Sequence, residues 1–593
     1  MSRAGWTLAL GLAACGRPEP TFNRDIAPIV FENCAGCHRP GESGPFSLLS
    51  YADVAKRGSQ IVEVTQSRTM PPWLPAEGPE IRGERRLSDE QIRTLELWVA
   101  QGMQEGLPED LPPPPSFRAG WALGAPDLIV EMTEPYVLAA SGPDVYRNFV
   151  IPDVVPETRY VRAFEFRPGN MRVAHHAFVL VDTTDGSLRT DRADPEPGFH
   201  GIHGSQSAVP PDGFFLSWTP GREPSEGLDG LAWRLDDAAD LVIQLHLQPS
   251  GKAETIRSSV GLYFAKGPPR LNPLTLVVTS RDLDIPAGER AYVVERSHVV
   301  PIDLKVVTVL PHAHFLGKEL SARATLPGGE KIDLLRIPRW DFNWQAAYDY
   351  REPVSLPRGT TVSIRFVYDN SADNPFNPHS PPQRVTYGIE SRDEMCEFWL
   401  QVLPERSEES PILERDFQRV LSELSIQTAR RDIAANPANF QAHLTLGQFL
   451  PGEGKIEEAL QELRLASQID PKSSEPHLYA GLILQARNQH AQAESAFRSG
   501  IALDPGNSVL HTALGEFLLS RGRPAEAQMA FEKALEWDRG NYPARLQLGL
   551  ACAQQGNLAR ARQELLRCLE SRPGDPDAKR VLAEVEARAA RGK

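Results

Sequence analysis

The pattern of apolar and polar positions divides the chain into regions of different character. The first, residues 21–105, ends in an amphipathic helix for which Ser88 is a natural N-cap. Asp89 and Glu90 supply acidic residues in its first turn, and the helix is expected to continue through Ala100. We predict a small all-α unit here.

Residues 121–402 consist of short runs of alternating apolar and polar residues, punctuated by Pro, Gly and Asp. No long helical period occurs, and many short strands at such spacing are typical of antiparallel sandwiches. The region, about 280 residues long, suffices for two sandwiches with a boundary near residues 267–269. The clearest strands are predicted at Ala174–Asp182, Asp240–Gln248, Ser258–Phe264, Ala291–Glu295, Lys305–Leu310 and Thr361–Tyr368.

From residue 435 a period of 34 residues takes over, after a charged stretch of helical character at 405–434. The repeating small residues are Gly447, Gly481, Gly515 and Gly549, with Ala459, Ala493, Ala527 and Ala561. Period and small positions resemble the tetratricopeptide repeat, in which small residues let two helices approach closely. The resemblance implies an α-solenoid with a concave surface for a protein partner. The histidines of this region are expected to be solvated.

The first 15 residues resemble an export signal. Arg3 precedes an apolar run that ends in Leu-Ala-Ala-Cys at 12–15 and is too short to span a bilayer as a mature helix. This ending resembles a bacterial lipobox, in which the cysteine, here Cys15, is lipidated. The alternatives are an ordinary signal peptide cleaved near Ala14 or a fortuitous apolar start. The resemblance implies an exported protein on the periplasmic side, lipid-anchored to a bacterial membrane.

Composition narrows the function only a little. The 593 residues are 41% hydrophobic and 24% charged, as in ordinary globular proteins, and the net charge of -15 argues against nucleic acid as a partner. Six cysteines in this length do not form a disulfide framework. Only Cys552 and Cys568 are plausibly close, and small buried residues explain them better.

The segment 33–38, Asn-Cys-Ala-Gly-Cys-His, has the Cys-x-x-Cys-His spacing of covalent haem attachment. Cys34 and Cys37 would form thioethers to the haem, and the next helix turn would place His38 beneath the iron. A redox pair or half of a zinc site are the alternatives. No second cysteine pair lies within reach and no strand-then-helix pattern precedes the motif, so we expect one covalently bound haem c.

A methionine is expected as the other iron ligand. Met70 lies in a proline-stiffened loop, whereas its rival Met103 lies past the helix end beside Gly102. The order of attachment motif, ligand loop and closing helix resembles class I c-type cytochromes. The resemblance implies electron transfer, because His/Met ligation raises the haem potential and leaves no open position on the iron. A stiff spacer with consecutive prolines at 112–115 follows.

Four groups of potential metal ligands lie in the strand-rich region. Residues i and i+2 of a strand share a face, so His312 and His314 can bring two imidazoles to one point. His175 and His176 are adjacent, and both can reach one metal only where the strand is irregular. Taken singly, each group is equally well explained by core or surface residues. The groups are His175-His176, Gln244-Leu245-His246, His312-Ala313-His314 and the segment 393–397 around Met395.

Taken in order, the four groups resemble the type II copper monooxygenases, whose members include peptidylglycine alpha-hydroxylating and dopamine beta-type enzymes. The segment 368–371, Tyr-Asp-Asn-Ser, adds to the likeness. The resemblance implies two copper ions on facing sandwiches across a watery cleft. The implied ligands are His175, His176 and His246 for an electron-storing copper, and His312, His314 and Met395 for an oxygen-binding copper.

The substrate side departs from that family. Peptide-binding relatives carry an arginine two residues before the His-x-His, where this chain has Leu310, and a tyrosine four residues after the methionine, where it has Trp399. An unpaired buried carboxylate is strongly disfavoured. We therefore expect a neutral, largely apolar or aromatic substrate.

Together these features predict an exported copper-dependent monooxygenase. It would hydroxylate a C–H bond of a small organic substrate with O₂, and electrons from an outside donor would arrive through the fused haem. The alternative is a non-catalytic haem and copper electron-transfer or copper-handling module that docks a partner through its repeats. The predicted divisions are a signal peptide with lipobox (1–15), a c-type cytochrome (21–105), a Pro-rich linker (106–120), the two monooxygenase sandwiches (121–266 and 267–404), a helical connector (405–434) and tetratricopeptide repeats (435–593).

Overall fold

The structure is a computed structural model that describes residues 19–591, except 43, 118–119, 185, 202–206, 221–223, 229, 238, 389 and 572–574. The predicted signal segment and Cys15 lie outside the described residues. Two compact units are distinguished, Met1–Trp73 with Gly83–Gly120 and Leu74–Arg82 with Trp121–Lys593. Among the described helices, none combines the length and apolar character needed to cross a membrane.

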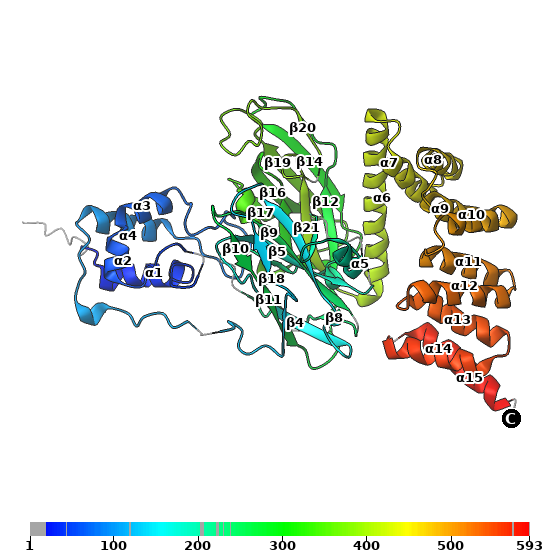
Figure 1. Cartoon of the computed structure of the whole chain (residues 1–593). Helices are drawn as coiled ribbons and strands as arrows, with labels where there is room; N and C mark the ends of the chain where they lie inside the picture. The colour runs from blue at the N-terminus through cyan, green and yellow to red at the C-terminus, as the bar shows by residue number, and fades with distance from the viewer. Residues whose placement is uncertain are drawn as a thin grey trace, which may run out of the picture. The chain divides into compact units, whose positions relative to one another are not determined.

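The first unit is helical (Figure 1). Its closing helix begins as predicted, because the Ser88 hydroxyl accepts from the Gln91 N–H while the Gln91 side chain accepts from the Ser88 N–H. Trp98, on that helix, is fully buried against Phe22. The elements are η1 (Phe22–Ile26), α1 (Ala27–Asn33), α2 (Tyr51–Ala55), α3 (Gly58–Gln66), α4 (Asp89–Ala100) and η2 (Pro108–Asp110).

The first sandwich packs a four-stranded sheet, ordered β1-β11-β4-β8, against a five-stranded sheet, ordered β6-β3-β9-β5-β7. All of its ladders are antiparallel. Strand β9 lies at the centre of its sheet, so its polar face is buried as well as its leucine face. The strands are β1 (Leu128–Glu131), β2 (Tyr136–Leu138), β3 (Val145–Ile151), β4 (Arg159–Arg167), β5 (Ala174–Asp182), β6 (Phe199–His200), β7 (Ser217–Trp218), β8 (Trp233–Leu235), β9 (Asp240–Leu247), β10 (Glu254–Ile256) and β11 (Ser259–Phe264), with a short helix α5 (Gly186–Ala193).

The second sandwich is built from two four-stranded sheets, ordered β12-β21-β15-β18 and β14-β19-β16-β17. Apolar side chains of both sheets are buried between them, among them Val309, Leu400 and Phe366. The strands are β12 (Leu274–Thr279), β13 (Asp284–Ile285), β14 (Tyr292–Val299), β15 (Leu304–His312), β16 (Gly317–Thr325), β17 (Lys331–Ile337), β18 (Tyr348–Leu356), β19 (Thr361–Tyr368), β20 (Val385–Thr386) and β21 (Glu397–Pro404).

Residues 74–82 correct the prediction of one continuous unit from 21 to 105. This segment lies along the edge strand β18, where Ile81 bridges to Tyr350 and the Arg82 N–H donates to the Asp349 carbonyl at 2.8 Å. Ile81 is only 6% exposed. An edge strand presents backbone groups without partners. Residues 74–82 bond some of these groups on β18, and no pattern in the sequence of 74–82 indicates this pairing.

The repeat region is a series of antiparallel helix pairs (Figure 1). The predicted small residues lie where neighbouring helices approach each other closely. A Cβ added at Gly515, for example, would lie 2.5 Å from the Phe531 ring. The expectation of solvated histidines is wrong for His443 and His511, which are buried and bond backbone carbonyls. The helices are α6 (Ser410–Ala435), α7 (Phe440–Phe449), α8 (Ile456–Ile469), α9 (Glu475–Ala486), α10 (His490–Leu503), α11 (Ser508–Ser520), α12 (Pro524–Trp537), α13 (Tyr542–Gln554), α14 (Leu558–Ser571) and α15 (Pro576–Arg591).

Candidate metal centre

A bulge in β5 brings the two adjacent histidines together. In the ladder with β9, Ala174 pairs with Leu247 while His176 pairs with His246, so His175 is the extra residue on its strand. A bulge sets two residues of one strand against one of its partner. In a regular strand, adjacent side chains point to opposite faces. The bulge allows His175 and His176 to lie on the same side.

Three imidazole nitrogens converge at this bulge. The Nδ1 atom of His176 lies 3.3 Å from Nδ1 of His175 and 3.4 Å from Nδ1 of His246. Nitrogens bound to one ion at about 2.0–2.1 Å are separated by roughly 3.3–3.6 Å in a tetrahedral or trigonal arrangement. The observed spacing therefore fits a metal ion held by three imidazoles, and these three residues form a ligand cluster.

Hydrogen bonds on the outer side of two rings fix which nitrogen faces inward. Nε2 of His246 donates to the Asp144 carboxylate at 2.7 Å, and Nε2 of His175 donates to the Asn343 side-chain oxygen at 3.1 Å. A neutral imidazole that carries its proton on Nε2 has its lone pair on Nδ1. Both rings thus present a lone pair to the centre, as a metal ion requires.

Burial favours the neutral form of two of the three imidazoles, those of His175 and His176. Burial, followed by the neighbouring His246, lowers the pKa of His175 to about 4, and the same two causes hold the pKa of His176 well below its usual range. The His246 ring is 1% exposed and stacks on Tyr146 with centroids 4.2 Å apart. Neutral, fixed imidazoles are the form of histidine that binds metals.

The His-x-His group forms a second cluster at the end of β15. The His312 and His314 rings have centroids 5.1 Å apart. Nδ1 of His312 donates to the Gln345 side-chain oxygen at 2.5 Å, and Nδ1 of His314 donates to the Asp393 carbonyl at 3.1 Å. Their lone pairs therefore lie on Nε2, the opposite choice from the first cluster. Burial lowers the pKa of His314 to about 3.

Glu394 joins the backbone of this turn to that of Met395. Its fully buried carboxylate accepts from the N–H groups of His314 at 2.8 Å, Leu316 at 2.7 Å and Met395 at 3.1 Å. Burial raises the pKa of Glu394 to about 8, whereas the three backbone donors favour the ionised form. Glu394 thus links the backbone of Met395 to that of His314 and Leu316.

The two predicted pocket residues are neighbours beside this cluster. Leu310 and Trp399 are paired across β15 and β21, and the next pair on the same face is His312 with Glu397. Both Leu310 and Trp399 are half-buried. The Trp399 indole N–H donates to the Glu397 carboxylate at 2.9 Å. Leu310 and Trp399 therefore lie side by side next to His312, with the Glu397 carboxylate beside them; their role at a substrate site remains a prediction.

Several residues of both clusters were missed from the sequence. Asp144, Asn343, Gln345 and Glu394 hold ligand residues in place, yet the first three lie far from their histidines along the chain. Glu394 was within the predicted segment 393–397, although no role was predicted for it.

The Cys-x-x-Cys-His segment has free thiols and a correctly oriented histidine. Nδ1 of His38 bonds the Phe46 carbonyl at 3.3 Å, which leaves Nε2 as the nitrogen available to an iron. Burial lowers the pKa of His38, so the ring is neutral. A Cβ at Gly44 would lie 2.7 Å from His38 Nδ1, so only glycine permits this close approach. These residues fit a covalently bound haem.

The two candidate methionines differ in their surroundings. Met103 packs into the helical core, where a Cβ at Gly58 would lie 2.6 Å from its sulfur. Met70, followed by Pro71, is half-buried in its loop. Met103 is thus packed against α3, while Met70 lies in the loop that follows α3.

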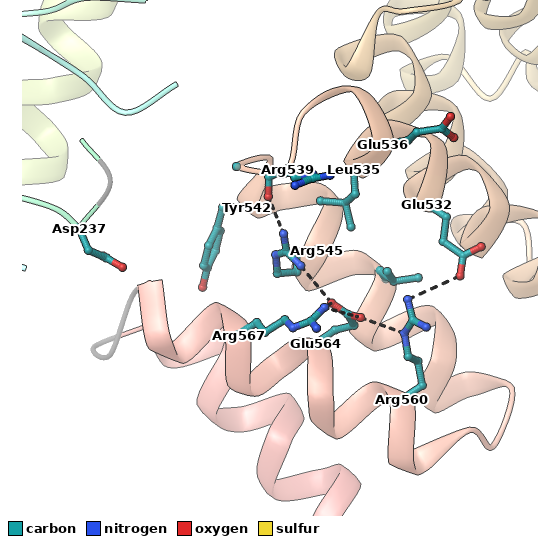
Figure 2. A pocket seen from close by; sticks show the side chains of 12 residues that line it. Asp237, Glu532, Leu535, Glu536, Arg539, Tyr542, Arg545, Arg560, Glu564 and Arg567 are labelled. Atoms are coloured by element: carbon teal, nitrogen blue, oxygen red, sulfur yellow. Dashed lines mark hydrogen bonds and ion pairs between the residues drawn. The ribbon is translucent and has the colours of Figure 1, made fainter. Parts of the chain in front are cut away.

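A cavity of about 760 Å³ opens among α12, α13 and α14 in the repeats (Figure 2). Three arginines point toward the carboxylate of Glu564, which is 1% exposed. Arg560 Nε lies 2.9 Å and Arg545 Nη1 3.2 Å from it, with Arg567 at 3.4 Å. The carboxylate balances much of the positive charge that the cavity would otherwise present.

Comparisons with known proteins match two parts of the chain. Residues 275–410 match the family described as copper type II ascorbate-dependent monooxygenase, C-terminal domain. Residues 478–543 and 518–585 match tetratricopeptide repeat families. The first match includes His312, His314 and Met395, whereas the first histidine cluster lies outside it. No curated protein matches the chain significantly.

Three similar solved structures each cover about a quarter of this chain. YrrB, described as a tetratricopeptide repeat protein with an unusual peptide-binding site, is 22% identical over 27% of this chain and 84% of its own, with a TM-score of 0.25. MamA is 22% identical over 28% and 95%, with a TM-score of 0.24. PilF of Pseudomonas aeruginosa is 23% identical over 26% and 69%, with a TM-score of 0.24.

Replacement of Glu394 by glutamine tests the role of its carboxylate. Glu394→Gln leaves buried N–H donors facing an amide that cannot accept from all of them. At a pH above the pKa of Glu394, where the group is ionised, we expect the free energy of unfolding to fall by about 1.5–3 kcal/mol, measured by chemical denaturation. The control is Glu352→Gln on the exposed side of β18, which should change stability by less than about 0.5 kcal/mol. Equal stability of the two variants would contradict the role given to Glu394.

Proposed function

We propose, on the premise that residues 275–410 are a copper type II monooxygenase domain, that this protein is an exported copper-dependent monooxygenase with its own haem. The reaction is R–H + O₂ + 2 e⁻ + 2 H⁺ → R–OH + H₂O, so two electrons must come from outside the substrate. The observation that carries the proposal is the convergence of three Nδ1 atoms in the first cluster, together with the hydrogen bonds that orient histidine rings in both clusters.

The chain offers a different donor set for each of two copper ions. His175, His176 and His246 present nitrogens alone, which suit either oxidation state of copper. The second set combines His312 and His314 with the thioether of Met395, a soft ligand that favours Cu(I). Copper ions held by the two sets would pass on electrons received from the donor and would activate O₂ for hydroxylation.

The residues of the chain orient the substrate and the ligands. Leu310 and Trp399 provide an apolar wall beside the second cluster, while Asp144, Gln345 and Glu394 hold rings and backbone in place. Trp399 fixes the Glu397 carboxylate through its indole N–H. A preorganised arrangement of this kind lowers the cost of reaching the reactive geometry.

We propose further that residues 21–105 carry one covalent haem c. Cys34 and Cys37 would attach it, and His38 and Met70 would ligate its iron. The matched family is described as ascorbate-dependent, whereas a haem on the same chain would supply electrons at high effective concentration. The repeats would bind a protein partner through their concave surface.

Rapid mixing tests the haem as electron donor. Fully reduced, copper-loaded protein is mixed with O₂ and a turned-over substrate while the haem absorbance is followed. We expect the haem to be oxidised together with product formation. His246→Ala removes one ligand of the first cluster and should leave the haem reduced for at least tenfold longer. Product formation with haem that stays reduced would overturn the proposed electron supply.

The substrate class is tested with paired compounds that differ only in a carboxylate. Wild type should disfavour the acid, because the wall is apolar and Glu397 adds like charge. Leu310→Arg should reduce this discrimination by tenfold or more in kcat/KM, while Leu310→Met keeps the volume and neutrality and should not. A wild-type preference for acids would show that another residue anchors the substrate and that the wall is misassigned.

Export and lipid anchoring through Cys15 form a separate proposal, supported by the Leu-Ala-Ala-Cys ending of the apolar run. The protein should fractionate with membranes and carry a lipid on Cys15. Cys15→Ser should become soluble or keep its uncleaved N-terminus. Identical fractionation of both proteins, with an unmodified wild-type N-terminus, would reject the lipobox.

A further inference from the structure

We propose that the turn between β17 and β18 is a bridge that positions both copper sites as one unit. This turn, residues 338–347, supplies Asn343 to His175 of the first cluster and Gln345 to His312 of the second. The inference rests on the proposed function, because it takes both clusters as copper sites. The bridging residues would be positioning residues, acting on the reaction only through the histidines.

The two contacts come from adjacent parts of one short turn. Asn343 lies in η4 (Phe342–Trp344), and only Trp344 separates it from Gln345. The Asn343 oxygen is 3.1 Å from His175 Nε2, and the Gln345 oxygen is 2.5 Å from His312 Nδ1. His175 belongs to the first sandwich and the turn to the second, so this contact joins the two sandwiches at the site.

Asp341 sets the orientation of the Asn343 amide. One oxygen of Asp341 accepts from the Asn343 backbone N–H at 2.9 Å and from its side-chain amide nitrogen at 3.0 Å. With the amide nitrogen occupied in this way, the Asn343 oxygen is the atom that faces His175. Asp341 therefore controls the bridge without bonding either histidine.

Aromatic packing ties the same turn to the second cluster. The Phe342 ring is buried, with its centroid 5.7 Å from that of His314 and 4.4 Å from that of Phe315. Trp340, at the start of the turn, donates its indole N–H to the His314 carbonyl at 3.1 Å. A movement of the turn would therefore shift both clusters together. Two unrelated contacts would not couple the clusters in this way.

The test measures copper affinity in two backgrounds that each keep one cluster. His314→Ala leaves the first cluster alone, and His246→Ala leaves the second. Competition with a copper chelator gives the affinity in each. Loss of an outer partner typically costs about 10–100-fold in metal affinity. We expect Asp341→Ala to weaken copper binding by tenfold or more in both backgrounds.

Matched variants separate the bridge from general loosening of the fold. Gln345→Leu should weaken copper binding in the second-cluster background, and Gln345→Glu, which keeps an acceptor for His312, should restore it. Glu352→Gln on β18 should change neither affinity. In protein with both sites filled by Cu(II), dipolar EPR should show a broader distribution of copper–copper distances after Asp341→Ala.

The outcomes are distinct. A loss of affinity at only one cluster in Asp341→Ala, with an unchanged copper–copper distance distribution, would show two independent contacts and overturn the bridge while the proposed function stands. If neither the two background proteins nor the wild type bound copper, the proposed function would be overturned, and the bridge with it.

Discussion

In each neutral imidazole, the hydrogen bond made by one nitrogen determines whether the other nitrogen carries a lone pair. At His246 and His175 the outer partner is an acceptor on Nε2, and at His312 and His314 it is an acceptor on Nδ1. An imidazole proton can occupy only one position in the neutral ring. In the neutral rings these four contacts leave the lone pair on Nδ1 of His246 and His175 and on Nε2 of His312 and His314, and the two sandwiches hold the acceptors in place.

The β-bulge is the local device that this constraint needs. A regular strand would separate His175 from His176, and the extra residue in β5 allows both to face His246 on the fully buried strand β9. The second cluster is assembled differently, from a strand end and a carboxylate that collects backbone donors around Met395. The structure thus brings three imidazoles together at the bulge and links the backbone of His314 to that of Met395 at the end of β15.

Sequence reasoning reached the features that depend on neighbours along the chain. The Ser88 capping box, the strand that leads to His312 and the close glycine contacts of the repeats follow from local spacing, and the structure has them. The need for an irregular strand at His175 also followed from geometry. The outer partners did not, because Asp144 is 102 residues from His246 and Asn343 is 168 residues from His175. The excursion of 74–82 onto β18 likewise depends on an edge strand formed elsewhere.

Metal content per chain is the most direct measurement of the central claim, that both clusters hold copper through these ligands. Mass spectrometry of metals on protein loaded with copper and haem should give two copper ions and one iron in wild type. His176→Ala and His314→Ala should each retain one copper, with the iron unchanged. Two coppers in both variants, or fewer than two in wild type under saturating copper, would contradict the account.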